Sequence, residues 1–147
     1  QLLAAALFIV FTIAGSIFAG YLVSLDAGAV SSEFCSINET FDCSAVSQSK
    51  YAKLLGVPVA AFGLISYLLM LIGMVVHYKT KNETVETLLG ALVLVALAFS
   101  LYLTGVEAFI LHAWCILCLG SQISVIGMVV AFFYYRAQNR KIEKNCS

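Results

Sequence analysis

Cys115 and Cys118 lie three positions apart in the mostly apolar segment HAWCILCLG, residues 112–120. Side chains at positions i and i+3 of a helix share one face, so these two thiols can be joined in a disulfide. If Cys115 begins the helix, the helix dipole stabilises its thiolate and makes it a good leaving group in disulfide exchange. The residue types and their spacing therefore predict a redox-active dithiol.

Three further cysteines complete the set of five. Cys35 and Cys43 lie between the first two apolar runs, and Cys146 lies in the basic tail, where it is interpreted as an ordinary free thiol. Attachment of a c-type haem requires the pattern CxxCH, which Leu119 breaks. A four-thiolate zinc site is the weaker alternative, because the gap between Cys35 and Cys43 is wider than the usual spacing of about two to four residues. No metal is expected.

The composition is that of a membrane protein. Hydrophobic residues make up 62% of the 147-residue chain and charged residues 11%, against about 25% charged residues in an average soluble domain. A helix needs about 20 apolar residues to cross a bilayer. The runs at about 1–25, 57–77, 86–111 and 115–136 meet this length. We therefore expect an all-α integral membrane protein, a four-transmembrane-helix bundle that forms a single domain over residues 1–147. The first run is longer than the apolar region of a cleaved signal peptide, so a retained span is expected.

Lysine and arginine residues are distributed unevenly about these spans. Of the eight in the chain, six lie between the second and third runs or after the fourth, and only Lys50 and Lys53 follow the first. The positive-inside rule places the six in the cytoplasm, so both termini are predicted to be cytoplasmic. The segment 26–56 and the turn before Cys115 then face the periplasm, the cell exterior or a lumen, where disulfides persist. The net charge of zero gives no indication of a nucleic-acid partner.

The outer segment 26–56 is too long to lack structure in a compact bundle. Its second half, DCSAVSQSKYAKLLGVP, is predicted to form a short interfacial helix, capped at its start by Asp42 or Ser44 and ended by Gly56. A plain connecting loop is the alternative. The predicted helix would roof the outer end of the bundle and has an apolar side formed by Val46, Tyr51, Leu54 and Leu55.

Two features within the spans have simpler interpretations. Small residues recur at helix-packing intervals, as at Gly15 and Ala19 or Gly127 and Ala131, and we expect them only to let helices approach closely. Glu107 lies near the outer end of the third span, about two turns before the first cysteine of the CxxC pair. A carboxylate within a membrane is costly and usually functional, but at interface depth it can also simply reach water. Both interpretations stay open.

A relay of disulfides requires a final electron acceptor, and the sequence contains no motif for a metal, a flavin or a nucleotide. The dithiol at the mouth of an apolar bundle faces the lipid, where quinones dissolve. A quinone accepts two electrons and two protons, which one dithiol supplies. We therefore expect Cys115 and Cys118 to reduce a quinone such as ubiquinone, menaquinone or vitamin K.

The order of these cysteines resembles that of the vitamin K epoxide reductase family in its prokaryotic form. The resemblance covers nearly the whole chain and rests on Cys35, on Cys43 in FDCSAVSQSKYAKLLGVPVAAFG, and on the CxxC pair in EAFILHAWCILC. It implies a four-helix bundle around a quinone, with an outer loop that carries the shuttle cysteines. Another membrane disulfide-generating family also has four spans and two cysteine pairs, but it carries its CxxC in the first loop.

The resemblance also implies a role for each cysteine. Cys35 would exchange with a thioredoxin-like partner that delivers electrons from newly formed protein disulfides, and Cys43 would pass them to Cys115. Cys118 would lie closest to the quinone and reduce it. Many prokaryotic members continue into a fused thioredoxin-like domain, so the partner is expected either as a separate protein or as a segment removed after residue 147.

Four further residues are assigned to the quinone pocket, namely Ser49, Val59, Phe62 and Gln122. Ser49 matches a family serine on the loop helix. Vertebrate members hold the quinone carbonyls with an asparagine early in the second span and a tyrosine one turn past the CxxC, and the matching residues here are Val59 and Gln122. Gln122 retains a hydrogen-bond donor and Val59 does not, which favours plain quinone reduction over epoxide reduction.

Two alternative functions are left open. One is a vitamin K epoxide or quinone reductase of the endoplasmic reticulum, which the sequon at Asn38 permits. The other is a non-catalytic membrane scaffold whose outer cysteines form static disulfides, which would resist mild reductants. The lipid bilayer is a partner in every case. A monomer is expected, because a bundle that encloses its own ligand needs no second subunit.

Overall fold

The computed structural model describes residues 1–146 and is 81% helical. Residue 147, which ends the predicted domain, lies outside the described residues. Four helices are long and apolar enough to cross a membrane, and this confirms the predicted all-α membrane bundle. They are α1 (Leu2–Asp26), α3 (Val59–Thr80), α4 (Glu83–Val106) with its continuation η3 (Glu107–Leu111), and α5 (Ile116–Cys146).

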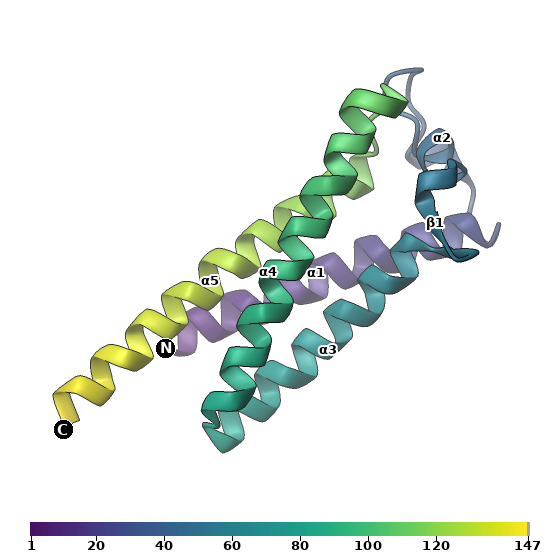
Figure 1. Ribbon diagram of the computed structural model, residues 1–147. Helices are drawn as coiled ribbons and strands as arrows, with labels where there is room; N and C mark the ends of the chain where they lie inside the picture. The colour runs from purple at the N-terminus through teal and green to yellow at the C-terminus, as the bar shows by residue number, and fades with distance from the viewer. Residues whose placement is uncertain (147) are drawn as a thin grey trace.

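The two ends of the bundle differ in what they carry (Figure 1). One end, called the basal end here, holds both described chain ends and the turn between α3 and α4. The other end is covered by the segment 27–58 between α1 and α3, which we call the cap. The helices α3 and α4 meet at the basal turn and diverge toward the cap (Figure 1).

The core lies along the contact of α1 with α5 and continues onto α3 and α4. Its largest fully buried side chains include Phe8, Met128 and Phe132. A Cβ atom at Gly127 would lie 2.7 Å from the ring of Phe11, so only glycine lets α1 pack this closely against α5. Small residues serve this purpose in membrane bundles, where lipid is as apolar as the side chains and close van der Waals packing drives helix association.

The connection between α3 and α4 is short and locally capped. Lys81 adopts a left-handed backbone conformation with a φ of 53° and donates its N–H to the carbonyl oxygen of His77, which ends α3. The side-chain oxygen of Asn82 accepts a hydrogen bond from the N–H of Thr84, 2.8 Å away, and begins α4. These caps satisfy backbone groups that would otherwise be left without partners at the ends of both helices.

The cap contains less helix than its sequence predicted. The helix α2 (Cys43–Ser47) forms as expected, but the predicted continuation through Leu55 is wrong. Leu55 and Gly56 have φ angles of 55° and 82°, a two-residue turn that joins β1 (Lys53–Leu54) to β2 (Val57–Pro58) in an antiparallel hairpin. Leu55 is consequently 95% exposed at the tip of this hairpin. The remaining cap elements are the short 3-10 helices η1 (Ser32–Phe34) and η2 (Lys50–Ala52).

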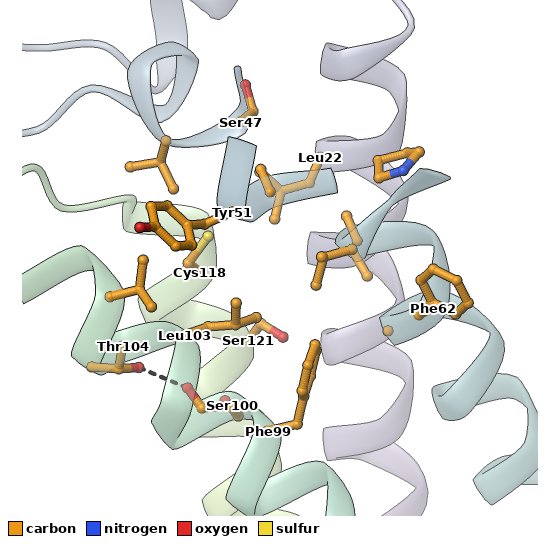
Figure 2. Close-up of a pocket in the computed structure, with 18 of the residues that line it drawn as sticks. Leu22, Ser47, Tyr51, Phe62, Phe99, Ser100, Leu103, Thr104, Cys118 and Ser121 are labelled. Carbon is orange, nitrogen blue, oxygen red and sulfur yellow. Dashed lines mark hydrogen bonds between the residues drawn. The ribbon is translucent and has the colours of Figure 1, made fainter. Parts of the chain in front are cut away.

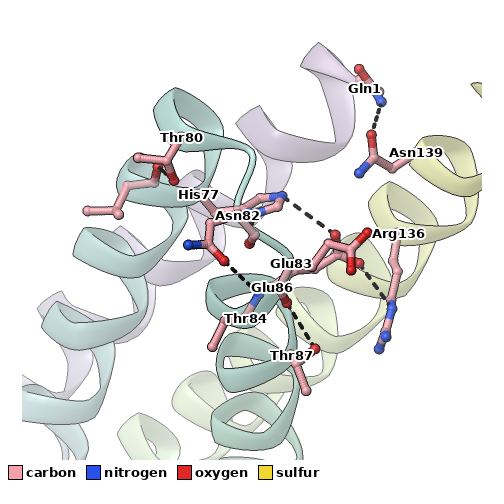
Figure 3. Close-up of polar contacts among 11 residues, drawn as sticks. Gln1, His77, Thr80, Asn82, Glu83, Thr84, Glu86, Thr87, Arg136 and Asn139 are labelled. Atoms are coloured by element: carbon pink, nitrogen blue, oxygen red, sulfur yellow. Dashed lines mark hydrogen bonds and ion pairs between the residues drawn. The ribbon is translucent and has the colours of Figure 1, made fainter. Parts of the chain in front are cut away.

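A buried polar network joins three helices at the basal end (Figure 3). Glu86 of α4 is 8% exposed, and its Oε1 lies 3.0 Å from Nε of Arg136 on α5. Its Oε2 lies 3.7 Å from Nε2 of His77 on α3. The Nδ1 of His77 is 3.1 Å from the carbonyl oxygen of Asn82 and donates a hydrogen bond to it, because a carbonyl can only accept. The carboxylate therefore links α3, α4 and α5.

Replacement of Glu86 by glutamine should lower the thermal stability of the detergent-solubilised protein, since Arg136 would lose its charged partner. Removal of one partner of a buried ion pair is destabilising, because it leaves the other charge without compensation. The measurement is the midpoint of thermal unfolding at neutral pH. Glu83→Gln is the matched control, because Glu83 is exposed on the same helix and should leave the midpoint nearly unchanged. Equal midpoints for the two variants would contradict the structural role of the network.

Candidate redox site

Asp42 organises the part of the cap that carries Cys43. Its Oδ1 accepts hydrogen bonds from the hydroxyl of Ser44 at 2.5 Å, the hydroxyl of Ser36 at 2.7 Å and the N–H of Ser44 at 2.9 Å. A longer bond of 3.3 Å from the N–H of Ala45 completes the N-terminal cap of α2. The hydrogen bonds from the Ser44 and Ser36 side chains lower the pKa of Asp42 from 3.8 to about 2. The first residue of α2 is thereby held in place by a carboxylate that stays ionised in all but strong acid.

Cys35 and Cys43 are joined in a disulfide within the cap. Both residues are buried, with exposed fractions of 1% and 0%. Their burial among Leu22, Val46 and Leu117 forms a second apolar cluster, which lies at the cap end and is separate from the main core. The disulfide therefore lies between the cap and the ends of α1 and α5, and a large partner protein cannot reach it without movement of the cap.

The connection from α4 to α5 places Cys115 against this disulfide. The α4 helix widens into the π-helix η3, and His112 then ends it with a left-handed φ of 51°. The N–H of Trp114 donates to the carbonyl oxygen of Thr40 at 2.8 Å, and Trp114 pairs with Phe41 in an isolated parallel β-bridge. The backbone just before Cys43 is thus bonded directly to the backbone just before Cys115.

Cys115 caps the start of α5. It directly precedes the helix, and its carbonyl oxygen accepts the hydrogen bond of the Leu119 N–H at 2.9 Å. Its Sγ accepts a hydrogen bond from the N–H of Cys118 at 3.3 Å, as the side chain of an N-cap residue does. The dipole of the long α5 helix and this hydrogen bond both stabilise negative charge on the sulfur.

The four cap-end sulfurs form a continuous row. The Sγ atoms of Cys43 and Cys115 are 3.2 Å apart, and Cys43 is bonded to Cys35. Cys115 is fully buried, whereas Cys118 is half-buried and lines a cavity. Both cysteines of the CxxC pair are free thiols. Disulfide exchange requires contact between the attacking sulfur and the disulfide, and the 3.2 Å contact of Cys115 with Cys43 meets this requirement.

A metal ion is a poor fit for the same cluster. The sulfurs of Cys35, Cys43 and Cys115 lie within 4.8 Å of one another, which is close enough for a shared ion. Thiolates are the ligands that a soft metal ion requires, and two of these sulfurs are already joined to each other. The donor set therefore favours disulfide chemistry over metal binding.

A cavity of about 190 Å³ lies directly beneath the cap, between the diverging helices α3 and α4 (Figure 2). Its walls are mainly apolar, with a few hydroxyl groups among them. Cys118 is the only cysteine on its wall among the described residues. Phe62 on α3 and Phe99 on α4 line the cavity and are nevertheless 40% and 39% exposed, so the cavity reaches the lipid-facing surface between these two helices. Its hydroxyl-bearing lining residues are Ser47, Ser49, Tyr51, Ser66, Tyr67, Ser100, Thr104 and Ser121.

Three of the four residues assigned to the pocket from the sequence lie on this wall. They are Ser49, Val59 and Phe62. The Ser49 hydroxyl donates to the carbonyl oxygen of Val46 at 2.8 Å, so it also helps to end α2. Gln122 lies behind the wall instead, where its Oε1 accepts hydrogen bonds from the hydroxyls of Ser100 and Thr104.

Sequence reasoning missed Tyr67, which lies on α3 and is 4% exposed. Its hydroxyl is hydrogen-bonded to the Oγ of Ser121, 2.7 Å away on α5. A Cβ atom at Gly15 would clash with the Tyr67 ring, so the small residue on α1 makes space for a side chain of the cavity wall. No sequence signal marks Tyr67, because its position depends on how α1, α3 and α5 pack.

Comparison with known proteins gives one family match. The model of the vitamin K epoxide reductase family matches residues 6–133, which includes all four cap-end cysteines and most of the bundle. No curated protein matches the chain.

Replacement of Asp42 by alanine should loosen the cap and speed the reduction of the Cys35–Cys43 disulfide. Loss of an N-cap side chain costs about 1 kcal/mol. The measurement is the rate of reduction by a phosphine, which remains active in acid, compared with Glu39→Ala as an exposed control in the same loop.

The pH dependence of this effect has a definite sign. The pKa of Asp42 is depressed from 3.8 to about 2 in the folded cap. Its stabilisation of the cap is therefore complete above pH 3.8, the pKa in the unfolded chain, and is lost as the pH falls through about 2. The wild type should therefore resist the phosphine more than Asp42→Ala at pH 5 and approach it near pH 2. Identical rates at pH 5 would show that Asp42 does not hold the cap.

Proposed function

Because the chain belongs to the vitamin K epoxide reductase family, we propose that this membrane redox protein is a thiol–disulfide oxidoreductase that takes electrons from a thioredoxin-like dithiol and reduces a quinone. The net reaction converts two thiols of the partner into a disulfide and a quinone into a quinol. Such a reaction supports disulfide bond formation in other proteins, since the partner is returned to its oxidising form.

The observation that carries this proposal is the row of sulfurs that leads from the cap to the cavity. The Cys35–Cys43 disulfide, the 3.2 Å contact from Cys43 to Cys115, and the position of Cys118 on the cavity wall form one path. A membrane scaffold with static disulfides would need neither two free thiols beside a disulfide nor a cavity next to one of them.

Each step of the relay exchanges one disulfide for another. When Cys115 and Cys118 are oxidised to a disulfide, the thiolate of Cys43 attacks Cys115 and releases Cys118 as a thiol. The thiolate of Cys35 then attacks Cys43 and releases Cys115. The resulting state has a bridged cap pair and a free CxxC pair, which is the state of this structure. The partner dithiol finally reduces the cap disulfide through Cys35, after movement of the cap exposes it.

The cavity fits a quinone ring as the second substrate. Its apolar walls suit the ring, its hydroxyl groups can donate hydrogen bonds to carbonyl oxygens, and Cys118 supplies the reducing sulfur. The opening beside Phe62 and Phe99 leads toward lipid and would let an isoprenoid tail leave the bundle. Val59 lines the cavity without a hydrogen-bond donor, which supports reduction of a quinone rather than an epoxide.

The placement of charge supports a single orientation for this multi-pass protein. Lysine and arginine are concentrated at the basal end and beyond it, which supports a cytoplasmic basal end with both termini on that side. The cap then faces the periplasm, the cell exterior or a lumen, where the partner thiols are. The whole site lies within one chain of four spans, which supports a monomer that acts as a single domain.

Replacement of Cys118 by alanine should abolish quinone reduction, since this thiol contacts the cavity. The measurement is quinone absorbance with purified protein and a reduced thioredoxin-like dithiol. Cys35→Ala should fail with the protein dithiol but retain turnover with a small dithiol that reaches the CxxC pair directly. Cys146→Ala is the control, because this exposed thiol lies outside the relay. Absence of quinone-dependent turnover in the wild type with every reductant would leave only the scaffold function.

A larger side chain at position 63 should block the cavity without disturbing the helices. Gly63 lines the cavity, and a Cβ atom there would meet no other atom within 4 Å. Gly63→Leu should raise the quinone KM about tenfold or more, since the added side chain occupies the ligand's volume. Gly105→Leu is the matched control, because Gly105 is equally open but lies outside the cavity wall. Exchange between the cap disulfide and the CxxC pair should be normal in both variants, and an unchanged KM in Gly63→Leu would place the quinone elsewhere.

A further inference from the structure

Among the described residues, the fold gives the buried acid Glu107 one hydrogen bond from the backbone and no cation. It lies where α4 widens into the π-helix η3 and is only 4% exposed. No lysine, arginine or histidine among residues 1–146 lies within ion-pair distance of it, in contrast to Glu86, which is paired with Arg136. A carboxylate at this depth is costly, and π-helical turns inside α-helices are frequent at functional sites.

The contacts of Glu107 are with the reacting pair. Its Oε2 accepts a hydrogen bond from the N–H of Cys115 at 3.3 Å. The carboxylate also lies near enough to the Cys118 side chain for its charge to act on the thiol. Both Glu107 and Cys118 line the cavity assigned to the quinone. One carboxylate thus lies on the same cavity wall as a thiol that must lose a proton, beside the space in which a carbonyl oxygen must gain one.

We propose that Glu107 is the proton carrier of the quinone-reducing step, taking the proton of the Cys118 thiol and delivering it to a carbonyl oxygen of the quinone. This inference rests on the proposed function. In the overall step the S–H bonds of Cys115 and Cys118 break and the bond between their sulfurs forms. The two electrons released by the thiols pass to the quinone, and the two protons complete the O–H bonds of the quinol.

The geometry favours Glu107 over the other titratable groups around the cavity. Asp26 on α1 is engaged in an ion pair with Lys53, 3.5 Å away. The Tyr67 hydroxyl is engaged with Ser121, which leaves Tyr51 as the remaining acidic group on the wall. A phenol holds its proton at neutral pH, because its ordinary pKa is about 10, and it is therefore a poor proton acceptor. Among residues 1–146, the carboxylate of Glu107 is the one basic group on the wall that lies near the reacting thiol without a cation beside it.

The decisive variant is Glu107→Gln, because an amide oxygen can still accept the hydrogen bond from Cys115 but the side chain cannot carry a proton. Loss of a positioned acid–base group slows a reaction by about 100-fold or more. We expect a loss of this size in the single-turnover rate of quinone reduction by the pre-reduced protein at neutral pH. Glu107→Asp should retain part of the wild-type rate, because it keeps a carboxylate. The control Glu39→Gln removes the same charge at an exposed position and should keep the full wild-type rate.

A second readout does not involve quinone. The alkylation rate of Cys118 can be followed against pH in a Cys146→Ser background by peptide mass spectrometry. Removal of the carboxylate's negative charge should make the Cys118 thiolate form more readily, so the alkylation profile of Glu107→Gln should move to lower pH. A variant that has a more reactive thiol and yet reduces quinone more slowly has lost proton transfer, because a change in thiol reactivity alone would speed the step.

The outcomes separate this inference from the function on which it rests. If the wild type does not reduce quinone, the proposed function is wrong. If the wild type reduces quinone and Glu107→Gln does so at the same rate, the function stands and the proton-carrier role is overturned. An unshifted alkylation profile in Glu107→Gln also overturns it, because the carboxylate would then not face Cys118. Normal exchange between the cap disulfide and the CxxC pair shows that the variant is folded.

Discussion

The contact between the sulfurs of Cys43 and Cys115 is the constraint on which the rest of the structure depends. The two residues are 72 positions apart in the sequence, and their Sγ atoms must come into van der Waals contact before one can attack the other. A cap loop cannot be held at this precision by burial alone. Three interactions hold the two cysteines together. Asp42 caps the helix that begins at Cys43, the Trp114 N–H bonds the carbonyl oxygen of Thr40, and the apolar cluster packs beneath both cysteines.

The membrane bundle positions Cys115 for this contact, because it fixes where α5 begins. The close approach of α1 to α5 is allowed by Gly127 and fixes the position of α5 along the bundle. The divergence of α3 and α4 from their short basal turn leaves a space that side chains do not fill. The cap covers that space from above, so that the half-buried sulfur, Cys118, meets a ligand site while Cys115 stays away from it.

The features that follow from composition and spacing were predictable from the sequence, and those that depend on packing between distant segments were not. Apolar runs of sufficient length identify the spans, because the thickness of a bilayer sets a minimum helix length. The i, i+3 spacing places Cys115 and Cys118 on one face in any helix. The hairpin was missed because Leu54 and Leu55 were assigned to a helical apolar side, whereas the Leu55–Gly56 turn reverses the chain. Gln122 was assigned to the pocket by matching positions, which cannot show that its amide is engaged behind the wall by the hydroxyls of Ser100 and Thr104.

Glu86 and Glu107, the two buried acids among the described residues, differ in the groups that compensate their charge. Glu86 has a cation and a histidine within reach, and its cost is offset by interactions that join three helices. Glu107 has a single backbone N–H at 3.3 Å and the nearby Cys118 thiol, which offset much less of that cost. A carboxylate with so little compensation, on the wall that a reducing thiol shares with a ligand cavity, is expected where a proton must move together with the electrons.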